Sequence, residues 1–256
     1  MTDTTNNNAA APHFPEQVTG MYILARALKN IGIENVYGLV GIPITEAAYI
    51  IQGQGIRFVG FRHEQQAGMA AATDGFVTGK PGVLMTVSSL GFLNGLTATA
   101  NATVNCYPMI QISGSSVREP IDLEQGTYEG LDQLNIAKPL VKAAYRVNRA
   151  EDIPTGVVRA YRAAVSGRPG GVYLDITTPA LGQVMDHAAA EALLQQPVDL
   201  QPSIVPAAEA VERAASLLAS AKKPAILIGK GAAQARVEDL VKKLVETTGV
   251  PFYPMS

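Results

Sequence analysis

Short apolar segments alternate with helical segments along most of this chain. Apolar runs too short for helices occur at residues 35–40, 56–59, 81–87, 108–114, 142–148 and 170–176. Between these runs, apolar residues three or four positions apart predict an amphipathic helix at residues 19–31, and Pro154 suits the first turn of a helix at 150–166. Buried strands that alternate with helices are typical of βαβ units. We therefore predict an α/β fold, a parallel sheet with helices on both faces.

Two stretches interrupt this pattern and divide the chain. Residues 1–16 are rich in Thr, Asn and Ala and predict a disordered tail, and the Ala/Gln/Pro-rich residues 183–206 predict a linker. The intervening residues 17–182 form the first predicted domain. Strands and helices resume over residues 207–256, but a single βαβ unit cannot bury both faces of a sheet. We expect this part to be the truncated start of a second α/β domain.

Composition narrows the classes of function. The net charge of −2 gives no electrostatic case for binding nucleic acid or an anionic membrane, and no run of about eighteen apolar residues predicts a membrane span. The single cysteine, Cys106, excludes an intrachain disulfide framework and suits a reducing cytoplasm. Only 16% of residues are charged, so we expect part of the surface to be covered in a homo-oligomer.

Few motifs carry recognisable chemistry. The histidines are scattered, and neither an HExxH nor a GxSxG pattern occurs, so we predict no metal site in this chain. Residues 119–138 form a polar segment of the kind that holds ligands beyond the ends of parallel strands. Lys230, in a Gly-Lys-Gly turn between a strand and a helix, lies in a plain turn or beside a bound phosphate. Arg168, in another Gly-rich segment, is a surface charge or an anion ligand.

Glu64 lies where the strand at 56–59 turns into a helix of small residues. By its position alone it is more often a partner of the helix macrodipole than a proton-handling group. Tyr128 and Glu129, in the long polar segment, are by the same reasoning usually solvated. The residues by themselves leave both interpretations open.

Several motifs together resemble the N-terminal pyrimidine-binding domain of thiamine-diphosphate decarboxylases and synthases. The resemblance is carried by Arg62-His63-Glu64, the strand at 82–87 with Gly91-Phe92-Leu93-Asn94-Gly95 after it, and the strand at 171–176. The loop Gly41-Ile42-Pro43-Ile44-Thr45 and the segment Gln125-Gly126-Thr127-Tyr128-Glu129 are similar to the oxalyl-CoA decarboxylase branch. One departure is Leu90, which replaces a proline common in that family and should alter the turn modestly.

The resemblance implies specific roles. Glu64 would hydrogen-bond N1′ of the cofactor's aminopyrimidine, and Tyr128 and Glu129 would lie near the reacting carbon. Ile42 would line the substrate pocket, and Arg168 and Lys230 would bind ADP as an activator. The implied reaction is decarboxylation of oxalyl-CoA to formyl-CoA and CO2 in oxalate degradation, by a cytoplasmic dimer or tetramer.

The family's element for Mg²⁺ and diphosphate is missing from this sequence. The resemblance therefore implies the N-terminal portion of an enzyme roughly twice as long, inactive by itself. Two alternatives remain: a related thiamine enzyme, such as a 2-hydroxyacyl-CoA lyase or an acetolactate-synthase-like protein, and a non-catalytic nucleotide-binding or assembly module.

Overall fold

A six-stranded parallel sheet forms the centre of the molecule. The computed structural model describes residues 16–117, 121–125, 130–195, 200 and 204–255. The strand order is β3-β2-β4-β5-β7-β6, and every neighbouring pair is parallel. The strands are β2 (Asn35–Gly38), β3 (Arg57–Gly60), β4 (Gly82–Thr86), β5 (Met109–Ser115), β6 (Ala143–Val147) and β7 (Gly171–Thr177). The predicted α/β class is confirmed.

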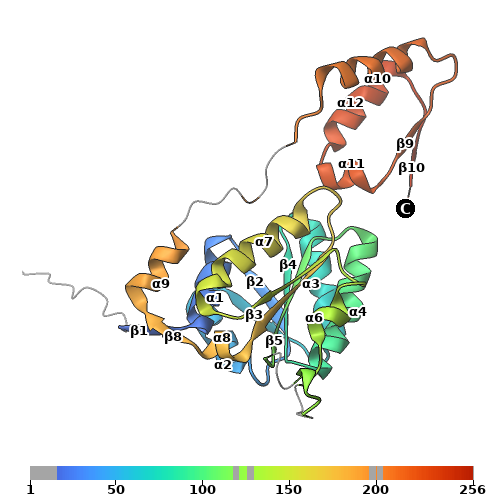
Figure 1. The fold of residues 1–256 in the computed structure, drawn as a ribbon. Coiled ribbons are helices and arrows are strands. Elements are labelled where there is room, and N and C mark those ends of the chain that lie inside the picture. The colour runs from blue at the N-terminus through green and yellow to red at the C-terminus, as the bar shows by residue number, and fades with distance from the viewer. Residues whose placement is uncertain (1–15, 118–120, 126–129, 196–199, 201–203, 256) are drawn as a thin grey trace, which may run out of the picture.

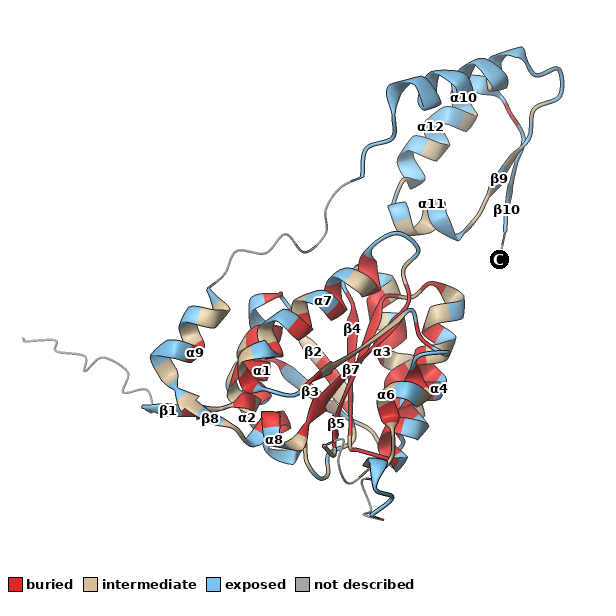
Figure 2. Ribbon diagram, in the orientation of Figure 1, coloured by how far each residue is buried: buried red, intermediate tan, exposed pale blue. Residues whose placement is uncertain are grey.

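Helices cover both faces of this sheet (Figure 1). Those packed on one face are α1 (Gly20–Asn30), α2 (Thr45–Gly53), α7 (Ile153–Val165), which follows the 3₁₀ turn η1 (Ala150–Asp152), and the short α8 (Thr178–Gly182). Those packed on the other face are α3 (Glu64–Thr78), α4 (Leu90–Asn105) and α6 (Gln133–Ala137). Buried residues line both faces of the inner strands β4, β5 and β7 (Figure 2). This double covering explains why the strands appear in the sequence as continuous apolar runs.

The two faces of the sheet differ in character. On the α1/α7 side, alternate residues such as Val83, Ile110 and Leu174 belong to one large apolar core. On the α4/α6 side, β5 and β7 instead present buried polar side chains, among them Gln111, Ser113, Tyr173 and Asp175. Buried polar groups require hydrogen-bond partners. Side-chain hydrogen bonds therefore join elements on this side of the sheet.

A small antiparallel pair closes one end of the sheet domain. β1 (Gln17–Thr19) pairs with β8 (Val184–Asp186), and α9 (His187–Leu194) packs on α1 through an Arg26–Glu191 ion pair of 2.9 Å. β8 and α9 lie within the stretch that composition predicts to be a linker. They are ordered because β8 pairs with β1 and α9 packs on α1, two elements that are distant in sequence. The predicted tail comprises residues 1–16, and all of these except Glu16 lie outside the described residues.

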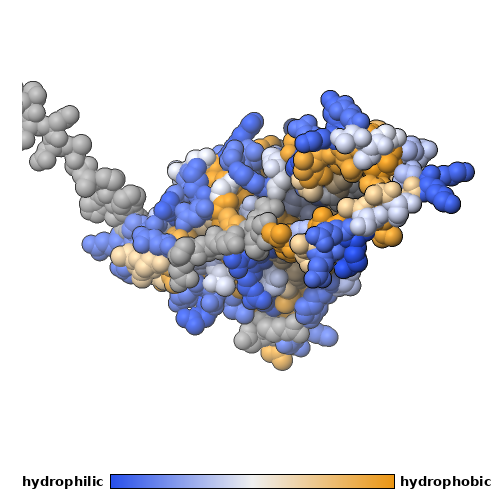
Figure 3. Space-filling view, turned by 90° about the horizontal axis from the view of Figure 1, so that it is seen from above, coloured by the Kyte–Doolittle hydropathy of each residue, from blue (hydrophilic) through white to orange (hydrophobic). Residues whose placement is uncertain are grey.

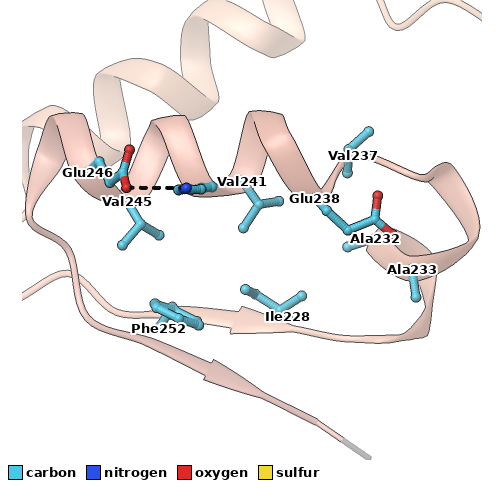
Figure 4. A pocket seen from close by; sticks show the side chains of 10 residues that line it. Ile228, Ala232, Ala233, Val237, Glu238, Val241, Val245, Glu246 and Phe252 are labelled. Carbon is cyan, nitrogen blue, oxygen red and sulfur yellow. Dashed lines mark ion pairs between the residues drawn. The ribbon is translucent and has the colours of Figure 1, made fainter.

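The C-terminal part begins a second α/β unit. It contains α10 (Ala208–Ser220), β9 (Ile226–Ile228), α11 (Lys230–Ala235), α12 (Glu238–Thr248) and β10 (Phe252–Pro254), with β9 and β10 parallel. Val241 and Val245 of α12 face Ile228 and Phe252 across an apolar cavity of about 430 Å³ (Figure 4). Large apolar side chains are exposed in this unit, including Leu217, Leu227 and Leu240, and hydrophobic patches interrupt the hydrophilic surface in the view from above (Figure 3). Among the described residues, no helix has the length and apolar character needed to cross a bilayer.

Candidate active site

Glu64 is the first residue of α3, directly after the turn that leaves β3. Nδ1 of the preceding His63 accepts a hydrogen bond of 3.2 Å from the backbone N–H of Gln65 and caps the helix. The Glu64 residue is only 6% exposed. A carboxylate that merely balances a helix dipole would keep its hydration, because removing it from water is costly. Burial therefore favours a role that requires a carboxylate inside the protein.

The first turn of α4 lies against this carboxylate. Nδ2 of Asn94 donates a hydrogen bond of 3.0 Å to Oε2 of Glu64. A Cβ atom on Gly91 would lie 3.0 Å from Oε1 and 2.4 Å from Cγ2 of Val87, so only glycine lets α4 approach this closely. Within the described part of the chain, no donor is hydrogen-bonded to Oε1. One carboxylate oxygen is thus oriented by the protein, and the other can bind a ligand group.

The turn from β4 into α4 has an unusual backbone. Ser89, the N-cap of α4, has φ 54° and ψ −103°, a sparsely populated region for a residue with a side chain. Leu90, which stands where the family commonly has proline, is 61% exposed and begins the helix. The modest change in the turn that we expected from this replacement stays a prediction.

The loop that contains Ile42 lies at the same edge of the sheet as Glu64. Both follow the carboxyl ends of parallel strands, β2 and β3, where ligands bind in open α/β sheets. Ile42 is 70% exposed. The next residue, Pro43, packs against Gly114 of β5 so closely that a Cβ there would lie 2.2 Å from Cγ of Pro43. Tyr128 and Glu129, the other predicted catalytic residues, lie outside the described residues.

Arg168 and Lys230 both lie at the opposite edge of the sheet. Both line a cavity of about 590 Å³, together with glycines 167 and 231 and Gln234. Arg168 donates through Nη2 to the carbonyl of Val104 over 3.0 Å, and Lys230 Nζ donates to Oδ1 of Asn105 over 3.0 Å. The resemblance assigned both residues to one ligand, ADP, and in the structure both line one cavity next to α11.

Sequence reasoning did not assign roles to Asn94, Gly91 or Gln133. The sequence does indicate that Asn94 and Gly91 lie on one helix face, since they are three residues apart in a predicted helix. Nothing in the sequence connects that face to Glu64. Among the described residues, no group of three or more His, Cys, Asp or Glu side chains is placed to hold a metal ion.

Comparison with known proteins defines the class. Residues 18–136 match the family described as thiamine pyrophosphate enzyme, N-terminal TPP binding domain, and residues 211–256 match the central domain of the same enzymes. The chain therefore belongs to the thiamine pyrophosphate enzymes.

Within this class, the chain is 50% identical to oxalyl-CoA decarboxylase of Escherichia coli (strain K12) over 94% of its length. It is 42% identical to 2-hydroxyacyl-CoA lyase of Oryza sativa subsp. japonica over 93%, and 31% identical to acetolactate synthase of Mycobacterium bovis over 92%. The chain spans only 43%, 42% and 38% of these three relatives, respectively.

The residues present fit the pyrimidine half of thiamine diphosphate. The carboxylate of Glu64 is buried, and Asn94 fixes Oε2. Oε1 lies beside Gly91, and no donor among the described residues is hydrogen-bonded to it. A heterocyclic ring nitrogen that reached Oε1 would find a proton-sharing partner there.

Proposed function

We propose that this chain supplies the pyrimidine-binding part of a thiamine-diphosphate-dependent carboxy-lyase that converts oxalyl-CoA to formyl-CoA and CO2. The proposal rests on the carboxylate of Glu64, which is buried and has one oxygen hydrogen-bonded to Asn94. Glu64 lies within the part of the chain that matches the TPP binding domain. The choice of substrate is supported by the 50% identity to an oxalyl-CoA decarboxylase, against 42% to a 2-hydroxyacyl-CoA lyase.

Glu64 is the catalytic residue of this proposal. Asn94 orients its Oε2, so that Oε1 holds or shares a proton at N1′ of the aminopyrimidine. When bound, thiamine diphosphate supplies an electron-accepting thiazolium, which takes up the electron pair that CO2 leaves behind. Burial of Glu64 excludes water that would otherwise compete for that proton.

The remaining roles extend the proposal to the whole site. Ile42 lines the pocket for the acyl-CoA, and Tyr128 and Glu129 act near the reacting carbon. Mg²⁺ and the diphosphate group bind through a domain outside this sequence, contributed by a neighbouring subunit of a cytoplasmic dimer or tetramer. ADP binds at Arg168 and Lys230, in the cavity at the opposite edge of the sheet.

The test uses the protein encoded by the whole reading frame that contains this chain. Supplied with thiamine diphosphate and Mg²⁺, it should release CO2 and formyl-CoA from oxalyl-CoA and turn over 2-hydroxyacyl-CoA and pyruvate poorly. Efficient turnover of either other substrate, with none of oxalyl-CoA, would assign it to the corresponding relative instead.

A substitution tests the role of Glu64. Glu64→Gln keeps the shape of the side chain but removes its proton-accepting charge, and should lower turnover at least about a hundredfold. Glu46→Gln is the matched control, because Glu46 is also an acidic residue in the first turn of a helix, α2, but is exposed. Near-normal turnover of Glu64→Gln would refute the proton-sharing role.

The cavity at Arg168 and Lys230 supports one alternative of another class, a nucleotide-binding module without catalysis. Calorimetry separates the two functions. The enzyme binds thiamine diphosphate, whereas the module binds ADP alone and is indifferent to Glu64→Gln.

A further inference from the structure

Gln133 joins three elements from the interior of the protein. It lies on α6 and is fully buried. Its Oε1 accepts a short hydrogen bond from the backbone N–H of Ser89, in the turn that begins α4. Its Nε2 donates to the carbonyl of Gly114 over 3.0 Å and to the hydroxyl of Tyr173 over 2.9 Å. Both ends of the side-chain amide are therefore bonded.

The side chain of Gln133 lies where buried polar groups of β5 and β7 adjoin an apolar cluster. The cluster between the sheet and helices α4 and α6 contains Phe92, Leu96, Ala137, Val141 and Tyr173. An amide in such a place must be hydrogen-bonded to avoid a desolvation cost, and an apolar residue would avoid the requirement altogether. The presence of glutamine at this point indicates that its particular bonds matter.

The bond to Ser89 is made to a residue in an unfavourable backbone conformation. Ser89 has the positive φ of 54°, and its side chain does not cap α4. The N–H of an N-cap residue has no partner within its own helix, so another group must satisfy it when it is buried. Gln133 provides that acceptor and holds Ser89 in a conformation that a residue with a side chain seldom adopts.

The turn at Ser89 determines where α4 begins. The carbonyl of Ser89 accepts a hydrogen bond of 3.0 Å from the N–H of Leu93, so the first turn of the helix is built directly on it. Gly91 and Asn94, which contact the Glu64 carboxylate, lie in or next to that turn. A shift of Ser89 would displace both contacts.

We propose that Gln133 is a positioning residue for catalysis: through Ser89 it holds the first turn of α4 against the carboxylate of Glu64. The proposal rests on the proton-sharing role of Glu64 but not on the identity of the substrate.

The test compares two substitutions in the same hydrogen-bond network. Gln133→Met keeps the length of the side chain and removes the acceptor for Ser89. Tyr173→Phe is the matched control, because it removes one partner of Nε2 but leaves the bond to Ser89 intact. Both variants lose a buried hydrogen bond, so both should lower the melting temperature.

Two measurements separate positioning from stability. Amide hydrogen exchange of the peptide 88–94, in the protein without cofactor, should become faster in Gln133→Met and stay unchanged in Tyr173→Phe. With thiamine diphosphate and Mg²⁺ at saturation, exchange of the thiazolium C2 proton with deuterated water should slow at least about tenfold in Gln133→Met. In Tyr173→Phe it should stay within about twofold of the unsubstituted protein. Equal C2-proton exchange in both variants would reduce Gln133 to a structural role and overturn the proposal.

A second variant covers the case in which Gln133→Met does not fold. Gln133→Glu keeps an acceptor oxygen for Ser89 and, as a buried neutral carboxyl group, an O–H donor for the carbonyl of Gly114, so the peptide 88–94 should remain protected and C2-proton exchange should remain within about threefold. Slow C2-proton exchange with an unchanged peptide would contradict the proposal.

Glu64→Gln is measured alongside: if it leaves C2-proton exchange unchanged, the role of Glu64 fails. If it slows that exchange but oxalyl-CoA is not consumed, only the substrate assignment fails.

Discussion

Nδ2 of Asn94 donates to Oε2 of Glu64 across 3.0 Å, although the two residues are 30 positions apart and lie on different helices. The bond orients one carboxylate oxygen and leaves the other without a donor among the described residues. Asn94→Leu keeps similar volume and removes the donor. We expect a roughly tenfold loss of turnover, corresponding to about 1.4 kcal/mol of transition-state stabilisation. Steady-state kinetics check this, with Asn101→Leu, on an exposed position of α4, as the control.

Gly91→Ala tests the close approach of α4 to the carboxylate. The added methyl group would lie 2.4 Å from Cγ2 of Val87 and 3.0 Å from Oε1 of Glu64, so the helix or the carboxylate must move. We expect turnover to fall more than tenfold and the free energy of unfolding to fall by about 1–3 kcal/mol. Gly53→Ala, at the end of α2 with no atom within 4 Å of the new methyl group, should change neither turnover nor stability appreciably. Normal turnover in Gly91→Ala would show that the approach is not needed.

Lys230→Met tests the cavity that Lys230 shares with Arg168. If the cavity is the proposed ADP site, removing one positive charge should weaken ADP binding about tenfold, or about 1.4 kcal/mol, as measured by isothermal titration calorimetry. Lys222→Met removes an exposed lysine that does not line the cavity and should leave the affinity unchanged. Equal affinities of the two variants would exclude Lys230 as a nucleotide ligand.

The pairing of Glu191 with Arg26 predicts a pH dependence of stability. Hydrogen bonds from Arg26 lower the pKa of Glu191 below its ordinary value of 4.5, against the opposing effect of burial. A carboxyl group with a lowered pKa contributes stability above its unfolded-state pKa and loses it as the pH falls through the folded-state pKa. Glu191→Gln should therefore destabilise the protein by up to about 1 kcal/mol at neutral pH, since the pair is partly exposed.

That difference should shrink as the pH falls below about 4.5, where Glu191 takes up a proton first in the unfolded state and, at lower pH, in the folded state. Urea unfolding at neutral pH and at about pH 3.5 measures it. Glu246→Gln is the control, because its pairing with Lys242 is longer, at 3.9 Å, and exposed. An effect of Glu191→Gln that is the same at both pH values would contradict the electrostatic explanation.

Much of the fold could be predicted because its information is local. The continuous apolar run at β4 and the similar run at β5 report strands buried on both faces, and every residue of both strands is buried. Glu64 was also placed correctly at a helix start, since a strand end followed by small residues is a local pattern. Its burial was not predictable, because α4 is what shields it.

The order of residues was enough to predict the α/β class, the succession of the six strands of the parallel sheet, and the positions of Glu64, Ile42, Arg168 and Lys230 at or next to element ends. Which side chains contact one another depends on the packed structure. Asn94 reaches Glu64, Arg168 and Lys230 line one cavity, and β1 pairs with β8 inside an expected linker. Hydrophobic periodicity reports which face of an element is buried but not which partner buries it. Those partners are set by packing between residues far apart in the chain, as when Gln133 holds the turn at Ser89.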